Sequence, residues 1–186
     1  INNQSPIFDA VLGNPPYVKY ENFDKSELEI ARNACLQIGV QLRNKVSSWV
    51  PYLLLSTALL KKDGTLCMVL PYELLTADYA QDVRDHLENK FKKLTIVTFD
   101  KRVFGRTQQE VIVLHATNKG PKTFRRIQAR DVDDLSKSTL KSAKKVPNSP
   151  SWLRGKWTYL QIDKDVLHLL DSLVDQGHVF RLNESA

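Results

Sequence analysis

The sequence predicts an α/β protein that contains half of an open sheet. Short runs of apolar residues alternate with longer segments in which apolar residues recur every three or four positions. The last two apolar runs are joined by a short connection instead of a helical crossover, which favours an antiparallel hairpin. The resulting order of strand, helix, strand, helix, strand, strand is typical of half of an open α/β sheet.

Four strands are expected, and the first two end in turns that contain proline. Residues 7–12 form a mostly apolar run that stops at Gly13 and a double proline, which indicates a buried strand followed by a rigid turn. Residues 65–70 are almost continuously apolar, as in a strand covered on both faces of a parallel sheet. The third and fourth strands are expected at residues 94–99 and 110–115.

Two helices are expected between the first and second strands. The first begins at a capping-box pattern, Ser26-Glu-Leu-Glu, and continues at helical spacing until Gly39. The second covers residues 46–60, where Pro51 is tolerable because it falls in the first turn. Residues 61–64, Lys-Lys-Asp-Gly, are expected to close this helix.

A third helix is expected from Glu73 to about Lys90, before the third strand. Its apolar residues repeat every four positions, so one face should pack on the sheet. Arg84 and Glu88 are spaced to pair on the outer face. The pattern predicts one continuous helix.

Composition limits the class of protein. With 186 residues, 42% of them hydrophobic, the chain is long enough for one domain with a core. No apolar run approaches the roughly 20 residues that cross a bilayer, and the N-terminus lacks an initiator Met and a signal-peptide pattern. We therefore expect a cytoplasmic protein without membrane contact, cut from a parent chain that extends beyond both ends.

The cysteines and histidines do not indicate a catalytic or metal site. Cys35 and Cys67 lack the paired spacing of a zinc site or a disulfide framework, and each lies in an apolar segment. The four histidines are scattered and form no grouping with serine, aspartate or one another. We expect no metal ion.

Positive charge is concentrated in residues 119–156. This segment has 11 Lys/Arg against three Asp/Glu, a local net charge of +8, whereas residues 1–118 are nearly neutral. Such charges release counterions from nucleic acid, so the segment is a candidate phosphate-facing surface. A solvated basic linker is the alternative. The residues assigned to DNA binding are Lys122, Arg125, Arg126, Lys141, Lys144 and Lys145.

The C-terminal third lacks the regular pattern of the first 118 residues. Residues 119–156 lose periodicity and gain Lys, Ser and Pro, which indicates a connecting region. Residues 157–186 follow as a separate part, in which Asp163 can cap a last helix with Gly177 past its end. The expected apolar face of this helix consists of Val166, Leu169, Leu170 and Leu173.

The most informative segment is the turn after the first strand, Asn14-Pro15-Pro16-Tyr17. In open α/β sheets, ligands bind at the carboxyl ends of the strands. Two prolines fix the backbone and leave carbonyls without ladder partners. The turn can therefore direct an amide side chain, a free carbonyl and an aromatic ring at one planar ligand.

An adenine amino group suits this constellation of groups. The side-chain oxygen of Asn14 and the carbonyl of Pro15 could each accept one amino hydrogen, which would free the nitrogen lone pair to attack a sulfonium methyl group. Positioning and preorganised dipoles supply the catalysis, so no strong base is needed. The ring of Tyr17, rather than its hydroxyl, would stack on a base that has left the duplex.

Phe8 to Tyr20 resembles the catalytic motif of the amino-methyltransferases, and the turn with the residues after it is most similar to the large adenine methylases of type IIG restriction-modification systems. Further similarities follow in order through about residue 115. Residues 49–71 resemble the family's next helix and strand, and residues 103–114, Val-Phe-Gly-Arg-Thr-Gln-Gln-Glu-Val-Ile-Val-Leu, resemble its hairpin motif.

This resemblance implies the C-terminal half of a Rossmann-like, S-adenosylmethionine-dependent methyltransferase sheet that ends in an antiparallel hairpin. It implies Asn14, Pro15, Pro16 and Tyr17 as the catalytic turn, and Phe104 as a second aromatic wall against the flipped base, where a plain core phenylalanine is the alternative. It also implies S-adenosylmethionine and double-stranded DNA as partners. Residues 157–186 loosely resemble the segment that leads into a target-recognition domain.

One departure from the family concerns the methyl donor. The family's glycine-containing donor-binding motif should precede the double-proline turn, and the sequence has no equivalent of it. We expect most of the donor site upstream in the parent chain. The first strand would then lack a neighbour, which leaves an unprotected sheet edge.

Two other functions remain open on the sequence alone. Methyltransferases that modify a protein glutamine or a guanine amine of RNA share the double-proline turn, although residues 19–48 make a longer link than we expect for them. A DNA-binding fragment without catalysis is the alternative from another class, and the basic segment supports it.

Overall fold

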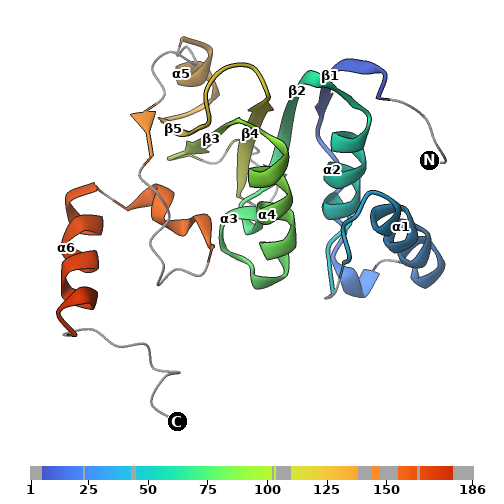
Figure 1. Cartoon of the computed structure of the whole chain (residues 1–186), viewed down its shortest axis with the longest axis horizontal. Helices are drawn as coiled ribbons and strands as arrows, with labels where there is room; N and C mark the ends of the chain where they lie inside the picture. Colours follow the sequence, from blue (N-terminus) through green and yellow to red (C-terminus); the bar gives the residue numbers. More distant parts are fainter. Residues whose placement is uncertain are drawn as a thin grey trace.

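A sheet with the strand order β1-β2-β4-β3-β5-β6 organises the described part of the chain (Figure 1). This computed structural model describes residues 6–22, 24–42, 45–101, 103, 110–137, 144–146, 155–162 and 164–177. The strands are β1 (Phe8–Gly13), β2 (Leu60–Pro71), β3 (Lys93–Phe99), β4 (Val111–Thr117), β5 (Thr123–Ala129) and β6 (Lys144–Lys145). All four expected strands are present, and the predicted α/β class is confirmed.

The strand directions place most carboxyl ends on one side of the sheet. β1 is parallel to β2, and β3 is parallel to β5, whereas β4 is antiparallel to both β2 and β3. The expected antiparallel hairpin of β3 and β4 is therefore confirmed. Because β1, β2, β3 and β5 share one direction, their carboxyl ends form a common side, where ligands bind in open α/β sheets.

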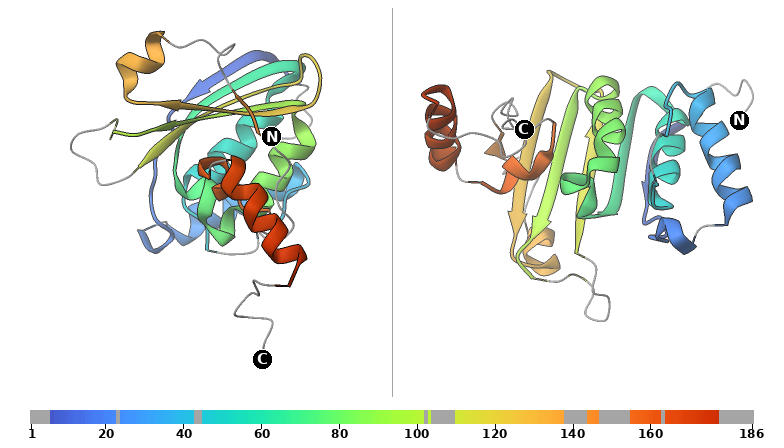
Figure 2. Two further views of the ribbon diagram at one scale, coloured as in Figure 1. Left: turned by 90° about the vertical axis from the view of Figure 1, so that its left-hand side faces the viewer. Right: turned by 90° about the horizontal axis from the view of Figure 1, so that it is seen from below.

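Most helices cover one face of the sheet (Figures 1 and 2). They are α1 (Lys25–Gln37), α2 (Trp49–Ala58), α3 (Glu73–Thr76) and α4 (Gln81–Lys90). The core lies between these helices and the sheet, where Trp49, Leu53 and Leu87 are fully buried with Leu66 and Ile96. On the opposite face, α5 (Val132–Lys137) places Leu135 against Val97 and Ile127.

The second helix is shorter than its sequence pattern predicts. α2 ends at Ala58, and residues 61–64, which were expected to close it, belong to β2. Phe8 pairs with Leu60 and Ala10 with Thr65, so β2 advances five residues while β1 advances two. The extra residues form an irregular start to β2, in which polar side chains stay exposed while Leu60 is buried.

The expected helix over residues 73–90 is broken. α3 ends at Thr76, Ala77 has an extended backbone, and a short 3-10 helix, η2 (Asp78–Ala80), precedes α4. The buried guanidinium of Arg84 donates to the carbonyls of Leu74 and Ala77 at 2.9 and 3.0 Å. These carbonyls lie at the break, so Arg84 satisfies acceptors that a continuous helix would satisfy itself.

The predicted pair of Arg84 and Glu88 is therefore wrong. Arg84 is only 1% exposed and lies on the inner side of α4. Glu88 instead accepts a hydrogen bond from the indole of Trp157 at 2.7 Å. The capping prediction for α1 also needs correction, since Asp24 is the N-cap and accepts from the backbone N–H groups of Ser26 and Glu27.

The sheet continues into the segment that was expected to be a connection. β5 pairs with β3, and β6 pairs with β5. Residues 157–161 form a 3-10 helix, η5 (Trp157–Gln161), and α6 (Lys164–Asp175) follows, with Gly177 at a positive φ of 72° past its end. The division into a catalytic half, a connecting region and a C-terminal part, with boundaries after residues 118 and 156, stays a prediction.

Helix α6 begins next to Asp163, whose expected capping role lies outside the described residues. Among the described side chains of α6, Leu167 is buried, whereas Val166 and Leu169 of the expected apolar face are 46% and 59% exposed. Among the described residues, no helix combines the length and apolar character needed to cross a membrane.

Candidate active site at the double-proline turn

The double-proline turn lies at the carboxyl end of β1. Asn14 is exposed, Pro15 is buried and Tyr17 is half-buried. The chain then continues into a short 3-10 helix, η1 (Tyr20–Asn22), at the same end of the sheet as α5 (Figure 2, right). The turn therefore has the position that sequence analysis expected for a ligand site.

The hydroxyl of Tyr17 connects the turn to the sheet. It lies 2.7 Å from the Asn14 Oδ1 atom and 2.9 Å from the carbonyl oxygen of Val69 in β2. A phenol has one hydrogen, so the two acceptors share it. Burial raises the pKa of Tyr17 to about 12, and the hydroxyl stays a neutral donor at physiological pH. The structure thus gives the Tyr17 hydroxyl a contact that its motif did not indicate.

A polar cluster fixes the start of α2 beside the turn. The Tyr79 hydroxyl contacts the carboxylate of Glu73, and it lies 3.4 Å from the Ser47 Oγ atom. The indole of Trp49 donates to the same hydroxyl at 3.3 Å. Burial, with Glu73 adding to it, raises the pKa of Tyr79 to about 12. The cluster joins α3 and η2 to the first turn of α2.

Two expected site residues cannot be placed. Phe104, the expected second aromatic wall, lies outside the described residues, as does Lys141 of the basic surface. On the carboxyl-end side, a cavity of about 90 Å³ lies between the ends of β2 and β3 and the start of β4. Tyr72 and Phe99 contribute aromatic side chains to its lining. Whether Phe104 stacks on a base stays a prediction.

The other basic residues lie along β5 and β6, at the opposite edge of the sheet from β1. Arg125 pairs with Lys145 and Arg126 with Lys144. The Arg126 guanidinium contacts the carbonyl of Leu160 and the side chain of Gln128, so it also has an intramolecular role. The structure brings these four residues together, and their assignment to DNA binding stays a prediction.

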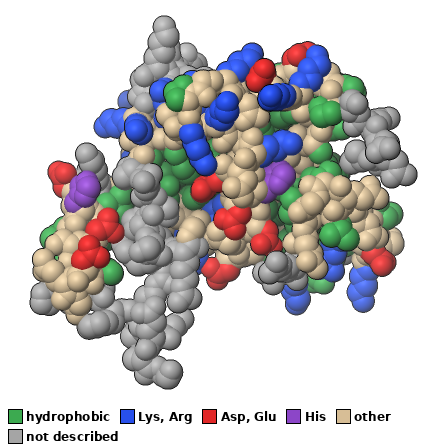
Figure 3. Space-filling model, viewed as in Figure 1, with side chains coloured by type: hydrophobic (Ala, Val, Ile, Leu, Met, Phe, Trp, Pro, Cys, Tyr) green, Lys and Arg blue, Asp and Glu red, His purple; other side chains and the backbone are tan. Residues whose placement is uncertain are grey.

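Lys122 lies at the amino end of β5, where it lines a cavity of about 520 Å³ together with Lys92 and Lys145. The side chain of Asn118 accepts from the backbone N–H of Lys92 at 3.1 Å and donates to the carbonyl of Lys62 at 2.9 Å. It thereby ties the starts of β2 and β3 to the loop that ends at Lys122. Figure 3 shows Lys and Arg side chains along the upper margin of the molecule, where these loops lie. The sequence pattern did not indicate that Lys92 lies with Lys122, because the two are 30 positions apart in the chain.

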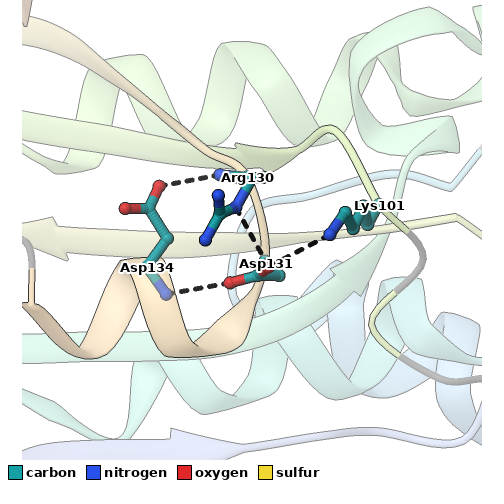
Figure 4. A network of polar contacts seen from close by, with 4 residues as sticks. All are labelled: Lys101, Arg130, Asp131 and Asp134. Carbon is teal, nitrogen blue, oxygen red and sulfur yellow. Dashed lines mark hydrogen bonds and ion pairs between the residues drawn. The ribbon is translucent and has the colours of Figure 1, made fainter.

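On the carboxyl-end side of β5, basic and acidic groups neutralise one another (Figure 4). Asp131 lies 3.3 Å from the Arg130 guanidinium and 3.6 Å from the Lys101 ammonium. A hydrogen bond from the backbone N–H of Asp134, together with these two cations, lowers the pKa of Asp131. Asp134 in turn accepts from the Arg130 backbone N–H at 2.8 Å. This end of β5 therefore carries little net positive charge.

Potential metal-ligating groups and the two cysteines are a separate feature of the described residues. No group of three or more His, Cys, Asp or Glu side chains in the described part of the chain could hold a metal ion. Burial raises the pKa of both Cys35 and Cys67, which keeps them as thiols. Cysteines whose pKa is raised are poor nucleophiles, because the thiolate is the reactive form.

The sequence matches one protein family over more than half of its length. The family is described as the Eco57I restriction-modification methylase, and its sequence model matches residues 1–104. The matched region contains β1, the double-proline turn, the helices α1 to α4 and the strands β2 and β3.

Curated relatives point in the same direction. The type II methyltransferase M.AccI of Acinetobacter calcoaceticus is 27% identical over 143 residues, which cover 73% of this chain and 25% of the relative. M.HincII of Haemophilus influenzae, also a type II methyltransferase, is 26% identical over 144 residues, which cover 74% and 26% of the two chains. The chain therefore spans about a quarter of the length of these relatives.

Solved structures of restriction-modification proteins share the fold. A complex of DrdV with DNA matches 86% of this chain and 19% of its own, with a TM-score of 0.63 and 14% identity. The type IIG restriction endonuclease BpuSI matches 95% of this chain and 23% of its own, with a TM-score of 0.63 and 17% identity. At these identities the similarity concerns the fold, and it agrees with the predicted methyltransferase-like sheet.

Proposed function

We propose that this chain, which belongs to the Eco57I restriction-modification methylase family, forms the target-base site of a methyltransferase that modifies the amino group of adenine in DNA. The observation that supports this most directly is the position of Asn14. Its side chain is exposed at the carboxyl end of β1, and the Tyr17 hydroxyl holds its Oδ1 atom at 2.7 Å. The acceptor is thus oriented before a base arrives.

The turn offers two acceptors to an amino group. A carbonyl oxygen has two lone pairs, so Asn14 Oδ1 can accept from an adenine amino hydrogen while it keeps the contact with Tyr17. Pro15 is buried, and the Pro16 that follows it restricts its ψ angle, which limits where the Pro15 carbonyl points. Two fixed acceptors would draw the amino nitrogen towards tetrahedral geometry and expose its lone pair.

The methyl donor in this proposal is S-adenosylmethionine, which supplies an electrophilic sulfonium methyl group. The described cavities of about 520, 470 and 90 Å³ are lined by residues other than Asn14 and Tyr17. We propose that most of the donor site is formed by residues of the parent chain that are not part of this sequence.

Double-stranded DNA is the proposed substrate, because the curated relatives are type II methyltransferases and the DrdV structure is a DNA complex. The parent would act within a restriction-modification system, in the cytoplasm. The alternatives that share the double-proline turn, methylation of RNA or of a protein glutamine, receive no support from these relatives.

The test is methyl transfer by the full-length parent protein to plasmid DNA, with radiolabelled S-adenosylmethionine. Asn14→Ala should lower the turnover by about 100-fold or more, because loss of one preorganised polar group at a reaction centre costs about 3 kcal/mol. The fold should persist, since the Asn14 side chain is exposed. Asn33→Ala, an exposed position in α1, is the matched control and should retain wild-type turnover.

The same assay separates the proposed substrates. Label should enter adenine of duplex DNA, and it should be absent from RNA and from protein. Label found in RNA or protein alone would contradict the proposal, and near-normal turnover of Asn14→Ala would contradict the assignment of the catalytic turn.

A further inference from the structure

We infer that Ser48 is a positioning residue for the catalytic turn, an inference that rests on the proposed function. Ser48 lies immediately before α2, 31 positions after Tyr17, and only 2% of it is exposed. No feature of the double-proline motif identifies it. Its role follows from three hydrogen bonds to the turn.

The Ser48 side chain contacts both peptide groups that flank Tyr17. Its hydroxyl donates to the carbonyl oxygen of Pro16 at 2.5 Å. The same oxygen accepts from the backbone N–H of Val18 at 2.9 Å. A hydroxyl is a small group that donates and accepts at once, so one side chain satisfies both groups.

These two contacts restrict the backbone of Tyr17. The Pro16 carbonyl belongs to the peptide plane before Tyr17, and the Val18 N–H belongs to the plane after it. Each plane is rigid, so holding both planes limits the φ and ψ angles of the residue between them. The direction of the Tyr17 side chain from the backbone is thereby defined.

A backbone contact strengthens this arrangement. The N–H of Ser48 donates to the carbonyl of Val18 at 2.9 Å, so Ser48 and Val18 are joined in both directions. Tyr17 then reaches Val69 through its hydroxyl, and Asn14 through the same atom. A chain of contacts therefore runs from Ser48 through Tyr17 to the acceptor oxygen of Asn14.

The use of this serine differs from the usual role at its position. Serine at a helix N-cap normally accepts from the N–H of the second or third helical residue. Ser48 makes no such side-chain hydrogen bond to α2. Its hydroxyl makes its hydrogen bonds to the turn instead. A serine that only stabilised the start of the helix would not need these bonds.

The test uses the full-length parent protein and three substitutions of Ser48. Ser48→Ala removes both side-chain contacts and should lower kcat about tenfold or more, because small misplacements of reacting groups have large effects on rate. Ser48→Thr keeps the hydroxyl and should recover most of the lost kcat. Ser48→Cys keeps the volume with a weak hydrogen-bonding group and should fall between them.

Ser56→Ala is the matched control, because Ser56 lies within α2 and is not in the chain of contacts through Tyr17. It should retain wild-type kcat. Thermal unfolding should show that each variant is folded at the assay temperature, and Ser48→Cys provides the comparison in case Ser48→Ala does not fold.

A double mutant separates positioning from general destabilisation. If Ser48 acts through the ring of Tyr17, Ser48→Ala should cause less than about a twofold further loss in a Tyr17→Ala background, since coupled residues are not additive. A second readout is the fluorescence of 2-aminopurine at the methylated position of a duplex. Ser48→Ala should reduce the quenching of the flipped base, as Tyr17→Ala does.

Wild-type kcat in a folded Ser48→Ala protein would overturn this inference. A full tenfold loss in the Tyr17→Ala background would overturn it equally, as would the same loss in Ser56→Ala. These results are distinct from failure of the proposed function, in which the wild-type protein itself would transfer no methyl group to DNA.

Discussion

Four strands of the sheet run in the same direction, and the outermost two of these, β1 and β5, differ in how well their side chains are covered. In β1, Phe8 and Leu12 are 44% and 78% exposed, and Ile7, just before the strand, is 54% exposed. β5 buries Ile127 and Ala129 and places Phe124 with its ring centroid 4.8 Å from that of Trp157. The strand that leads to the candidate active site is therefore the less protected of the two.

The turn after β1 is nevertheless held by contacts from outside its own strand. Tyr17 is held by Val69 of β2, and the peptide groups around it are held by Ser48 before α2. These contacts come from elements 30 or more residues downstream. β5, in contrast, is stabilised by packing against η5, where the ring of Phe124 contacts that of Trp157. The two regions should respond differently to mutation.

The largest expected effect on stability lies on the β5 side, at Arg84. Its guanidinium donates to the carbonyls of Leu74, Ala77 and Gly155, the last 71 residues away. Arg84→Met fills similar space but leaves these buried acceptors without a donor. The free energy of unfolding should fall by about 3 kcal/mol, measured by urea denaturation.

Catalysis is the control for this prediction. The parent protein with Arg84→Met should keep its kcat at temperatures where it stays folded, because Arg84 does not contact the turn. A selective loss of kcat in a protein with unchanged stability would show that the two regions are coupled, contrary to the comparison.

The next effect concerns the ring of Tyr17. Tyr17→Ala removes the stacking face, and engagement of the flipped base should weaken about tenfold or more, since stacking on an aromatic ring contributes roughly 1–3 kcal/mol. The measurement is 2-aminopurine fluorescence in a duplex that the parent methylates. An unchanged signal in a folded Tyr17→Ala protein would refute the stacking role.

The hydroxyl of Tyr17 gives a smaller effect, and here the structure changes the expectation. The motif alone suggests that Tyr17→Phe keeps most of the activity. Because the hydroxyl contacts Asn14 Oδ1 and the Val69 carbonyl, its removal should lower kcat about threefold to tenfold. Single-turnover methylation at saturating DNA measures this change. Wild-type kcat would mean that Asn14 is oriented without Tyr17.

The smallest effect is expected for the basic residues of β6. The double variant Lys144→Ala/Lys145→Ala should weaken DNA binding by the parent several-fold at moderate salt and reduce the slope of log affinity against log salt by about two. The kcat should not change, since β6 is separated from β1 by four strands in the sheet. An unchanged salt slope would identify these lysines as a solvated surface.

The sequence determined the parts of the structure that depend on neighbouring residues. Apolar runs located β1 to β4, and the connection after β3 indicated the antiparallel hairpin. The double proline marked the turn, because proline restricts the backbone locally and the effect is visible in four residues. The position of Asn14 at a strand end follows from the same local pattern.

Contacts between distant residues decided the rest. The break between α3 and α4 depends on Arg84, and helical periodicity cannot show that its guanidinium will turn inward. β5 was not expected because Thr-Phe-Arg-Arg-Ile-Gln-Ala has charged residues at its centre, and pairing with β3 supplies the stability that local pattern lacks.

The candidate site divides in the same way. Asn14, Pro15 and Tyr17 are adjacent in sequence, so their chemistry can be inferred from the motif. Ser48 and the Val69 carbonyl enter the site only through folding, because one is an ordinary serine before a helix and the other is a backbone group. Hydrogen bonds across 30 and 52 residues depend on how β1, β2 and α2 pack, and that packing exists only in the tertiary structure.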